Sequence, residues 1–213
     1  MKNVIVIGAG PAGLMASISA AENGAYVTLL EKNERVGRKL MITGKGRCNV
    51  CNNCDIDTLI ANIPKNAKFL YSAFSNFTPK QLMQFFENLG VALKTERGNR
   101  VFPVSDKAVD IVDALYKCAK DKGVKIKTAH ASGILTQDDK IWGVTLNDGT
   151  VLNCDSVILA TGGMSYPLTG STGDGYKMAE KLGHTVTELK PSLVPLDIHE
   201  GFCSHLSGLS LKN

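Results

Sequence analysis

The sequence predicts an α/β fold built on a parallel β-sheet, and three consecutive segments near the N-terminus predict it. Residues 4–7 form a continuous β-branched run, which is typical of a strand buried on both faces. Residues 14–23 carry Ala, Met and Ile at helical spacing and stop before Gly24, a residue suited to the left-handed end of a helix. Residues 25–30 form a second apolar strand that ends in Glu31. Together they predict a strand–helix–strand unit with parallel strands.

The middle of the chain predicts a loop, several helices and one more strand. Residues 36–54 are rich in Gly, Lys, Arg, Asn and Cys without a clear period, so we expect a loop there. Residues 55–89 are typical of helical pieces, with Thr78 as the cap of a helix that begins at the following Pro. Residues 124–128 form a strand after an amphipathic helix at 106–122, whose predicted buried face contains Val109, Val112, Leu115, Tyr116 and Ala119.

The last third predicts a small antiparallel meander inserted in this α/β frame. Residues 129–154 alternate short strands with turns at 138–139 and at 147–149. Residues 155–160 return to a buried parallel strand that leads into Thr161, Gly162 and Gly163, and residues 175–182 predict a final helix.

Composition and charge exclude several classes of protein. The hydrophobic share of 44% is that of an ordinary globular protein. The net charge is +4 and the basic residues are spread along the chain, so we expect no nucleic-acid partner. No run approaches the roughly 20 apolar residues of a membrane helix, and no secretory signal precedes the Gly-rich turn at Gly8. These features predict a cytoplasmic protein without a membrane partner, whose six Cys are reduced thiols.

The turn between the first strand and the first helix predicts a nucleotide site. Gly8-x-Gly10-x-x-Gly13 is a weak signal by itself, but here it joins a strand to a helix, and Glu31 closes the next strand. Gly8 allows a tight turn, Gly10 allows the backbone to approach a pyrophosphate, and Gly13 allows close packing of helix on strand. The carboxylate of Glu31 is placed to accept hydrogen bonds from ribose hydroxyls. The alternative is a Gly-rich turn that serves packing only. These features fit NAD and FAD equally well.

Several further strings resemble a known family. They are Gly37-Arg38-Lys39, Thr43-Gly44-Lys45-Gly46-Arg47-Cys48-Asn49, Ala160-Thr161-Gly162-Gly163 and Ser171-Thr172-Gly173-Asp174-Gly175. Together they are similar to bacterial FAD-dependent flavoproteins of the aminoacetone-oxidase-like or BaiN/YhiN-like kind, over residues 1 to about 200. The resemblance implies FAD in a Rossmann-like domain of the glutathione-reductase type. It also implies that residues 1–190 form the FAD-binding domain. Residues 191–213 would then be the beginning of an inserted substrate domain, and the chain would be truncated before that domain is complete.

The resemblance also implies which residues hold the cofactor. The glycine turn and Glu31 would hold the ADP half, residues 39 and 43–49 would run past pyrophosphate and flavin, and residues 129–130 would contribute backbone to the adenine. The complete predicted set is Gly8, Gly10, Pro11, Ala12, Gly13, Glu31, Lys32, Arg38, Lys39, Thr43, Gly46, Arg47, Cys48, Asn49, Ala129, His130, Ala160, Thr161, Gly162 and Asp174. Two alternatives stay open: Lys39 and Arg47 as solvated surface charges, and Asp174 as a helix cap.

The string Cys48-x-x-Cys51-x-x-Cys54 admits three interpretations. It resembles part of an iron–sulfur ligand set, it could supply a thiol pair that reacts with a flavin, or it could be three ordinary reduced cysteines. The family pattern accounts for Cys48 and places a polar residue at Cys51, so we favour the third interpretation and predict no metal site.

The function predicted from these observations is an FAD-dependent oxidoreductase that acts on a small organic substrate, with NAD(P)H as a possible transient electron donor. The flavin would carry the redox chemistry, and no residue of this chain is predicted to be a general acid or base. Two alternatives are an FAD-containing RNA-modification protein and a non-catalytic nucleotide-binding fragment. The oligomeric state is left open.

Overall fold

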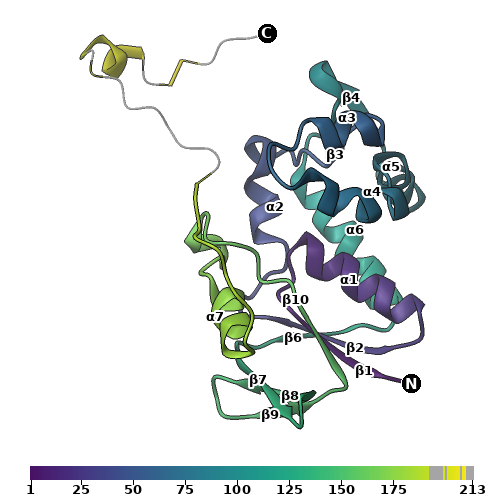
Figure 1. Ribbon diagram of the computed structural model, residues 1–213. Coiled ribbons are helices and arrows are strands. Elements are labelled where there is room, and N and C mark those ends of the chain that lie inside the picture. Colours follow the sequence, from purple (N-terminus) through teal and green to yellow (C-terminus); the bar gives the residue numbers. More distant parts are fainter. Residues whose placement is uncertain (192–198, 200, 207, 210–213) are drawn as a thin grey trace.

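The centre of the computed structural model, which describes residues 1–191, 199, 201–206 and 208–209, is a four-stranded parallel sheet (Figure 1). Its strand order is β10-β1-β2-β6, with bounds β1 Asn3–Ile7, β2 Tyr26–Glu31, β6 Lys125–Thr128 and β10 Ser156–Leu159. All neighbouring strands are parallel. The predicted parallel α/β sheet is therefore confirmed.

Two helices, α1 (Pro11–Glu22) and α6 (Ala108–Asp121), cover one face of the sheet and share a core with the central strands (Figure 1). The predicted helix at 106–122 is confirmed, but its predicted buried face is wrong at Tyr116, which is 41% exposed. Tyr116 follows the buried Leu115 by one residue, a rotation of about 100° that carries its side chain off the core face. The buried positions that replace it are Ala108, Ile111 and Cys118.

The predicted meander covers the opposite face, together with the helix α7 (Asp174–Lys181). Its strands are antiparallel in the order β7-β8-β9, at Ala131–Gln137, Lys140–Leu146 and Val151–Asn153. Side chains alternate along a strand, so Ile5 of β1 packs under the meander while Val6 packs under the helices. Residues 5–7 of β1 are therefore buried on both faces of the sheet, which explains why this strand contains apolar residues in succession.

A second sheet, which the sequence did not predict, contains three short antiparallel strands in the order β3-β5-β4. Their bounds are β3 Cys51–Asn52, β4 Leu93–Glu96 and β5 Arg100–Pro103, with a 3₁₀ turn η3 at Arg97–Asn99. The prediction of a loop at 36–54 is wrong in part, because this segment also contains the helix α2 at Arg38–Ile42 and a 3₁₀ turn η1 at Thr43–Gly46. Elements of two to five residues are too short to show a period in sequence.

The predicted helical region, which connects β3 to β4 in the chain, is confirmed as a set of short elements. They are α3 Ile56–Ala61, η2 Ala67–Leu70, α4 Tyr71–Asn76 and α5 Pro79–Asn88. Thr78 caps α5 as predicted: its hydroxyl accepts from the Gln81 amide and the Gln81 side chain accepts from the Thr78 amide. This reciprocal pair fixes the start of α5.

An ion-pair network supports the second sheet. The guanidinium of Arg47 pairs with Glu96 and, at 2.7 Å, with Asp106, and it lies 4.1 Å from the centre of the Phe102 ring. Lys94 pairs with the same Asp106 carboxylate at 2.7 Å. Hydrogen bonds from Arg47 lower the pKa of Glu96, and bonds from Lys94 and Arg47 lower that of Asp106.

The C-terminal part of the chain contains two more 3₁₀ turns, η4 at Pro167–Thr169 and η5 at Gly201–Leu206. The substrate domain predicted to begin within residues 191–213 falls mostly outside the described residues, so it stays a prediction. Within the part of the chain that the structure describes, no helix is long and apolar enough to cross a membrane.

We predict that the Arg47 network makes the stability of the fold depend on pH and that its contribution is lost at low pH. The two carboxyls have folded pKa values below their ordinary 4.5 and 3.8, so their stabilising contribution is present above those values and is lost as pH falls through the lower folded ones. Arg47→Met should lower the melting temperature at pH 7, and the decrease should be smaller at pH 3. Melting curves at both values test this, with Arg35→Met as a control that breaks an exposed pair at 3.7 Å. An Arg47→Met deficit independent of pH would contradict the prediction.

Candidate functional site

A cavity of about 540 Å³ opens at the carboxyl ends of β1, β2 and β10. In open parallel sheets this end of the strands is the usual place for a ligand. Many predicted cofactor residues lie in its wall: Gly8, Gly10, Pro11, Ala12, Glu31, Lys32, Arg38, Lys39, Ala129, His130, Ala160, Thr161, Gly162 and Asp174. The fold thus brings together segments that lie far apart in the sequence.

Two glycines of the turn are required by backbone packing. Gly8 has φ +101°, and a Cβ there would lie 2.6 Å from the carbonyl oxygen of Ala160. A Cβ at Gly13 would lie 1.8 Å from the carbonyl oxygen of Gly8. Gly13 itself therefore lies beneath the turn rather than in the cavity wall. These contacts hold α1 close against β1 and β10.

Gly10 differs from both, because no atom lies within 4 Å of the position of a Cβ there. It lines the cavity and caps α1, with Pro11 as the first helical residue. No side chain caps this helix start and no acidic residue lies in its first turn. The first amides of a helix have no intrahelical partner and carry partial positive charge, so open space and unpaired donors coincide here. This combination suits an anion such as a phosphate.

The carboxylate of Glu31 lies beside this helix start. Its Oε2 accepts a hydrogen bond from the Ala9 amide at 2.9 Å, and its Oε1 accepts from the Asn33 amide at 2.9 Å and from Asn33 Nδ2 at 2.6 Å. These donors fix the orientation of the carboxylate. Each carboxylate oxygen has about two acceptor positions, so one position on Oε2 remains for a ligand.

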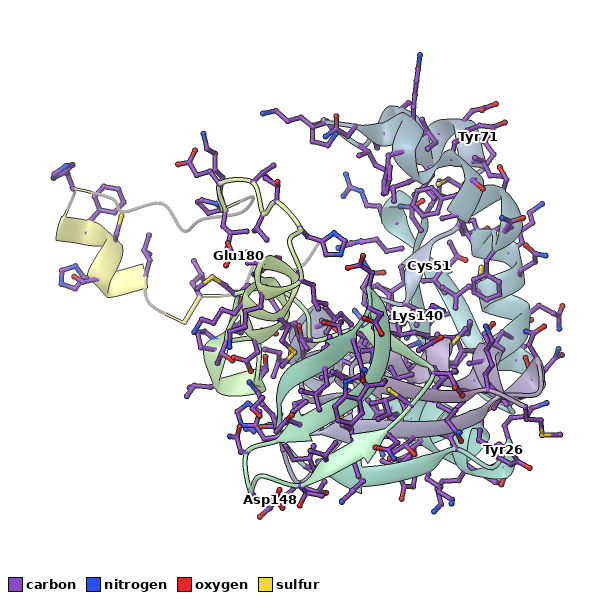
Figure 2. The ribbon with its side chains drawn as sticks, turned by 60° about the horizontal axis from the view of Figure 1, so that its bottom comes forward. Tyr26, Cys51, Tyr71, Lys140, Asp148 and Glu180 are labelled. Atoms are coloured by element: carbon purple, nitrogen blue, oxygen red, sulfur yellow. The ribbon has the colours of Figure 1, made fainter. Side chains whose placement is uncertain are left out.

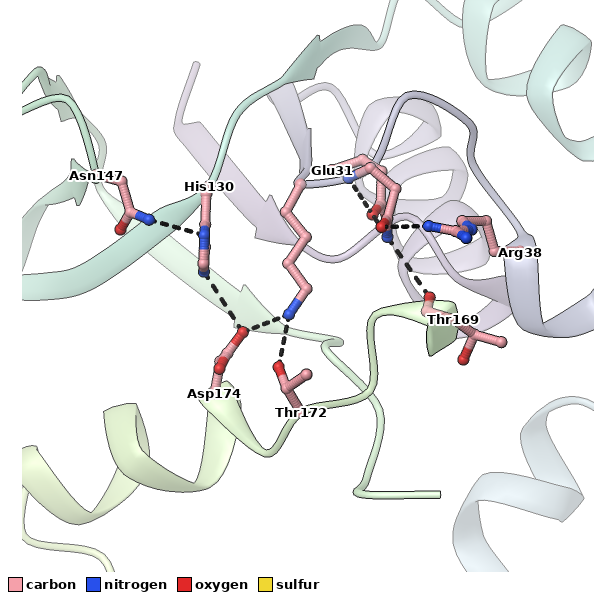
Figure 3. Close-up of polar contacts among 9 residues, drawn as sticks. Glu31, Arg38, His130, Asn147, Thr169, Thr172 and Asp174 are labelled. Carbon is pink, nitrogen blue, oxygen red and sulfur yellow. Dashed lines mark hydrogen bonds and ion pairs between the residues drawn. The ribbon is translucent and has the colours of Figure 1, made fainter. Parts of the chain in front are cut away.

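A second polar group crosses the cavity from the end of β2 to the start of α7 (Figure 3). Lys32 Nζ donates to Thr172 Oγ1 and to Asp174 Oδ2, both at 2.6 Å. His130 Nε2 lies 3.5 Å from the same Asp174 oxygen, and its Nδ1 lies 2.8 Å from Asn147 Nδ2. Burial acts to raise the pKa of Asp174, but hydrogen bonds from Lys32 and Thr172 and the nearby charges lower it. Asp174 is not the cap of α7, because Gly173 holds the cap position and no side chain caps this helix, but Asp174 lies in the first turn, where an acidic side chain is favourable.

Lys39 lies on the other side of the cavity, in the first turn of α2. Its Nζ donates to Ser165 Oγ at 3.2 Å, and partial burial lowers its pKa. Lys39 thus lies in the cavity wall while its hydrogen bond to Ser165 is exposed, so the alternative of a solvated surface charge stays open.

The structure does not bring the predicted residues of the 43–49 string to the cavity. The Arg47 side chain belongs to the ion-pair network described above, and Cys48 is completely buried in the core. The remaining members that lie outside the cavity wall are Thr43, Gly46 and Asn49. A role of this string toward the flavin stays a prediction.

Sequence reasoning missed several residues of the cavity wall. The missed residues are Asn33, Gly37, Thr169, Gly170, Ser171, Gly175, Tyr176 and Met178, together with the strand residues Ile7, Leu30, Ala131 and Leu159. Two signals were present: Asn33 lies two residues after the acidic end of β2, and Gly37, Ser171 and Gly175 stand in the strings that carry the family resemblance. Thr169 and Gly170 gave no signal because they reach the cavity only through the tertiary fold.

The cysteines give no sign of a metal centre. Within the described residues, no three His, Cys, Asp or Glu side chains are grouped so that they could hold a metal ion, and all six Cys are free thiols. Burial, followed by the neighbouring Cys54, raises the pKa of Cys51 to about 11. Burial also raises the pKa of Cys48, partly offset by a hydrogen bond with Thr43. Burial therefore disfavours the thiolate form of both residues, which is the nucleophilic form of cysteine.

Comparison with known proteins matches residues 2–211 to the model of the HI0933-like protein Rossmann domain. The chain is 34% identical over 201 residues to 3-dehydro-bile acid delta(4,6)-reductase of Clostridium scindens, covering 93% of this chain and 48% of the reductase. It is 30% identical over 208 residues to ribosomal RNA dihydrouridine synthase of Escherichia coli, covering 98% of this chain and 51% of the synthase.

Solved structures share the fold. A flavocytochrome c3 fumarate reductase in its open conformation superposes with a TM-score of 0.67 at 24% identity, over 85% of this chain and 40% of that protein. The chain spans about half the length of the curated relatives it matches. The match to the family model covers almost the whole chain, and it agrees with the α/β fold and with the glycine turn at its first strand. This chain belongs to the HI0933-like family of FAD-binding Rossmann proteins.

Proposed function

We propose that the cavity binds the ADP half of FAD and that the whole protein is an FAD-dependent oxidoreductase. One observation carries this proposal: the open space at Gly10, the uncapped start of α1 and the Glu31 carboxylate all border the same cavity. A dinucleotide needs a place for its pyrophosphate and an acceptor for its ribose hydroxyls. The residues present fit both requirements.

The chain's own residues would divide the work of binding. The first amides of α1 would take the pyrophosphate, and the free acceptor position of Glu31 would take a ribose hydroxyl. Ala129 and His130, which follow β6, would border the adenine. Lys39 and the backbone at 161–162 would border the path toward the flavin. These assignments follow from position in the cavity wall.

When bound, the flavin supplies the electron transfer, while the protein supplies orientation and electrostatics. The start of α2, where Lys39 Nζ donates a hydrogen bond to Ser165, would border that chemistry. Such a cation would stabilise negative charge that develops on a reduced ring system. We assign no general acid or base to this chain.

The finer identity of the protein rests on resemblance. We propose that it is of the aminoacetone-oxidase-like or BaiN/YhiN-like kind, that it acts on a small organic molecule, and that NAD(P)H serves as transient electron donor. The bile acid reductase named above supports a small-molecule substrate.

A second candidate function, modification of RNA, is favoured by one surface feature. Two rRNA dihydrouridine synthases, of Escherichia coli and Haemophilus influenzae, are 30% and 32% identical to this chain. Residues 58–86 carry three Lys and no Asp or Glu, and Phe69, Tyr71 and Phe77 of this segment are 86%, 55% and 41% exposed. Tyr71 projects from α4 at the end of the molecule far from the meander (Figure 2). Exposed aromatic rings with lysines suit a single-stranded nucleic acid.

We predict that Gly10→Val prevents nucleotide binding. A branched side chain would fill the space where the pyrophosphate must approach, so the dissociation constant for FAD should rise at least about 100-fold, or about 2.8 kcal/mol. Titration by flavin fluorescence measures it. The matched control is Gly133→Val in β7, where a Cβ would likewise have no atom within 4 Å but would lie outside the cavity wall. Unchanged FAD affinity in a folded Gly10→Val protein would refute the site.

The RNA candidate has its own test. Replacement of Lys65, Lys68 and Lys80 by Glu should weaken binding of a single-stranded RNA oligonucleotide and reduce the salt dependence of its affinity, because phosphate contacts release counterions. The control is the same replacement at three exposed lysines elsewhere: Lys2, Lys117 and Lys140. Fluorescence anisotropy of labelled RNA gives the readout. Equal effects of both triple variants would reject a dedicated RNA surface.

A further inference from the structure

Two cations flank the Glu31 carboxylate, and neither pairs with it. Lys32 and Arg38 both line the cavity with Glu31, yet none of the ion pairs in the part of the chain that the structure describes includes Glu31. Lys32 is engaged by Thr172 and Asp174 at 2.6 Å each. A carboxylate so close to two cations and paired with neither requires a physical cause for its isolation.

The cause on the Arg38 side is the amide of Asn33. Asn33 Nδ2 donates to Glu31 Oε1 at 2.6 Å, and Asn33 Oδ1 accepts from Arg38 Nη1 at 2.7 Å. One amide group thus forms a hydrogen bond with the guanidinium and another with the carboxylate. Its donor and acceptor ends allow only this order, because a carboxylate accepts and a guanidinium donates.

The segment opposite also fits the Asn33 side chain. Asn33 Nδ2 lies 3.5 Å from the Thr169 carbonyl oxygen. A Cβ at Gly170, where φ is +101°, would lie 2.6 Å from the same nitrogen. The backbone at 169–170 therefore leaves the room that the amide occupies.

We propose that Asn33 is a positioning residue that keeps Arg38 away from Glu31, so that the carboxylate remains available to ribose hydroxyls. This inference rests on the proposed nucleotide site. Without the amide, the exposed Arg38 side chain would meet the carboxylate directly. Arginine and carboxylate groups form bidentate pairs, and such a pair would occupy the acceptor position that Oε2 offers to a ligand.

The test compares ADP with 2′,3′-dideoxy-ADP by calorimetric titration of this chain. The ratio of the two dissociation constants reports hydroxyl recognition, and it should be about tenfold or more in the wild type, because hydrogen bonds to a charged group are strong. In Asn33→Ala the ratio should fall to about one or two, since the Arg38 guanidinium would then pair with the Glu31 carboxylate. In the double variant Asn33→Ala with Arg38→Ala it should return to within about twofold of the wild-type ratio. These fold-changes follow from one charge-assisted hydrogen bond gained or lost.

The rescue separates positioning from simple loss of structure, because a second truncation cannot repair damaged packing. Asn62→Ala is the control for loss of an amide: its Nδ2 donates to the Thr58 carbonyl at 2.8 Å, outside the cavity wall, and the ratio should not change. An unchanged ratio in Asn33→Ala, or a double variant no better than Asn33→Ala, would overturn the inference. A wild type that binds both nucleotides equally, or neither, would instead reject the nucleotide site at Glu31 and this inference with it.

Discussion

The close contact between backbone segments at the first strand–helix turn is the constraint on which the rest of the site depends. Gly8 approaches Ala160 and Gly13 approaches the Gly8 carbonyl at distances that leave no room for a side chain. Because of these contacts, the start of α1 faces the ends of β1, β2 and β10 across a short gap. The cavity, its unpaired amides and its glycine opening all result from that packing.

The electrostatics of the site follow a pattern in which each cation already has a partner. Lys32 is held by Asp174, Lys39 by Ser165, and Arg38 by the Asn33 amide. Glu31 is left with hydrogen-bond donors only. A partly buried carboxylate without a counter-ion is costly unless it is hydrogen-bonded, and backbone amides together with Asn33 meet that cost without a net charge. The arrangement is well suited to recognition of hydroxyl groups.

The sequence predicted the parts of the molecule in which one local pattern decides the structure. The parallel strands β1 and β2, the glycine turn between them and the helix cap at Thr78 each depend on residues close together in the chain, and all three are confirmed. The second sheet was missed because its strands are too short to show alternation. Arg47 looked like a ligand contact in sequence, but partners 49 and 59 residues away, Glu96 and Asp106, hold it elsewhere. Residue type alone cannot reveal such distant partners.

A crystal structure of this chain with ADP would show both the diphosphate contact and the ribose contact of the nucleotide site. We expect the diphosphate against the first amides of α1, above Gly10, and a ribose hydroxyl within hydrogen-bond distance of Glu31 Oε2. This expectation would be contradicted by ADP bound in the surface depression bordered by Tyr26 and Lys125, at the opposite ends of the same strands, or by a ribose that points away from Glu31.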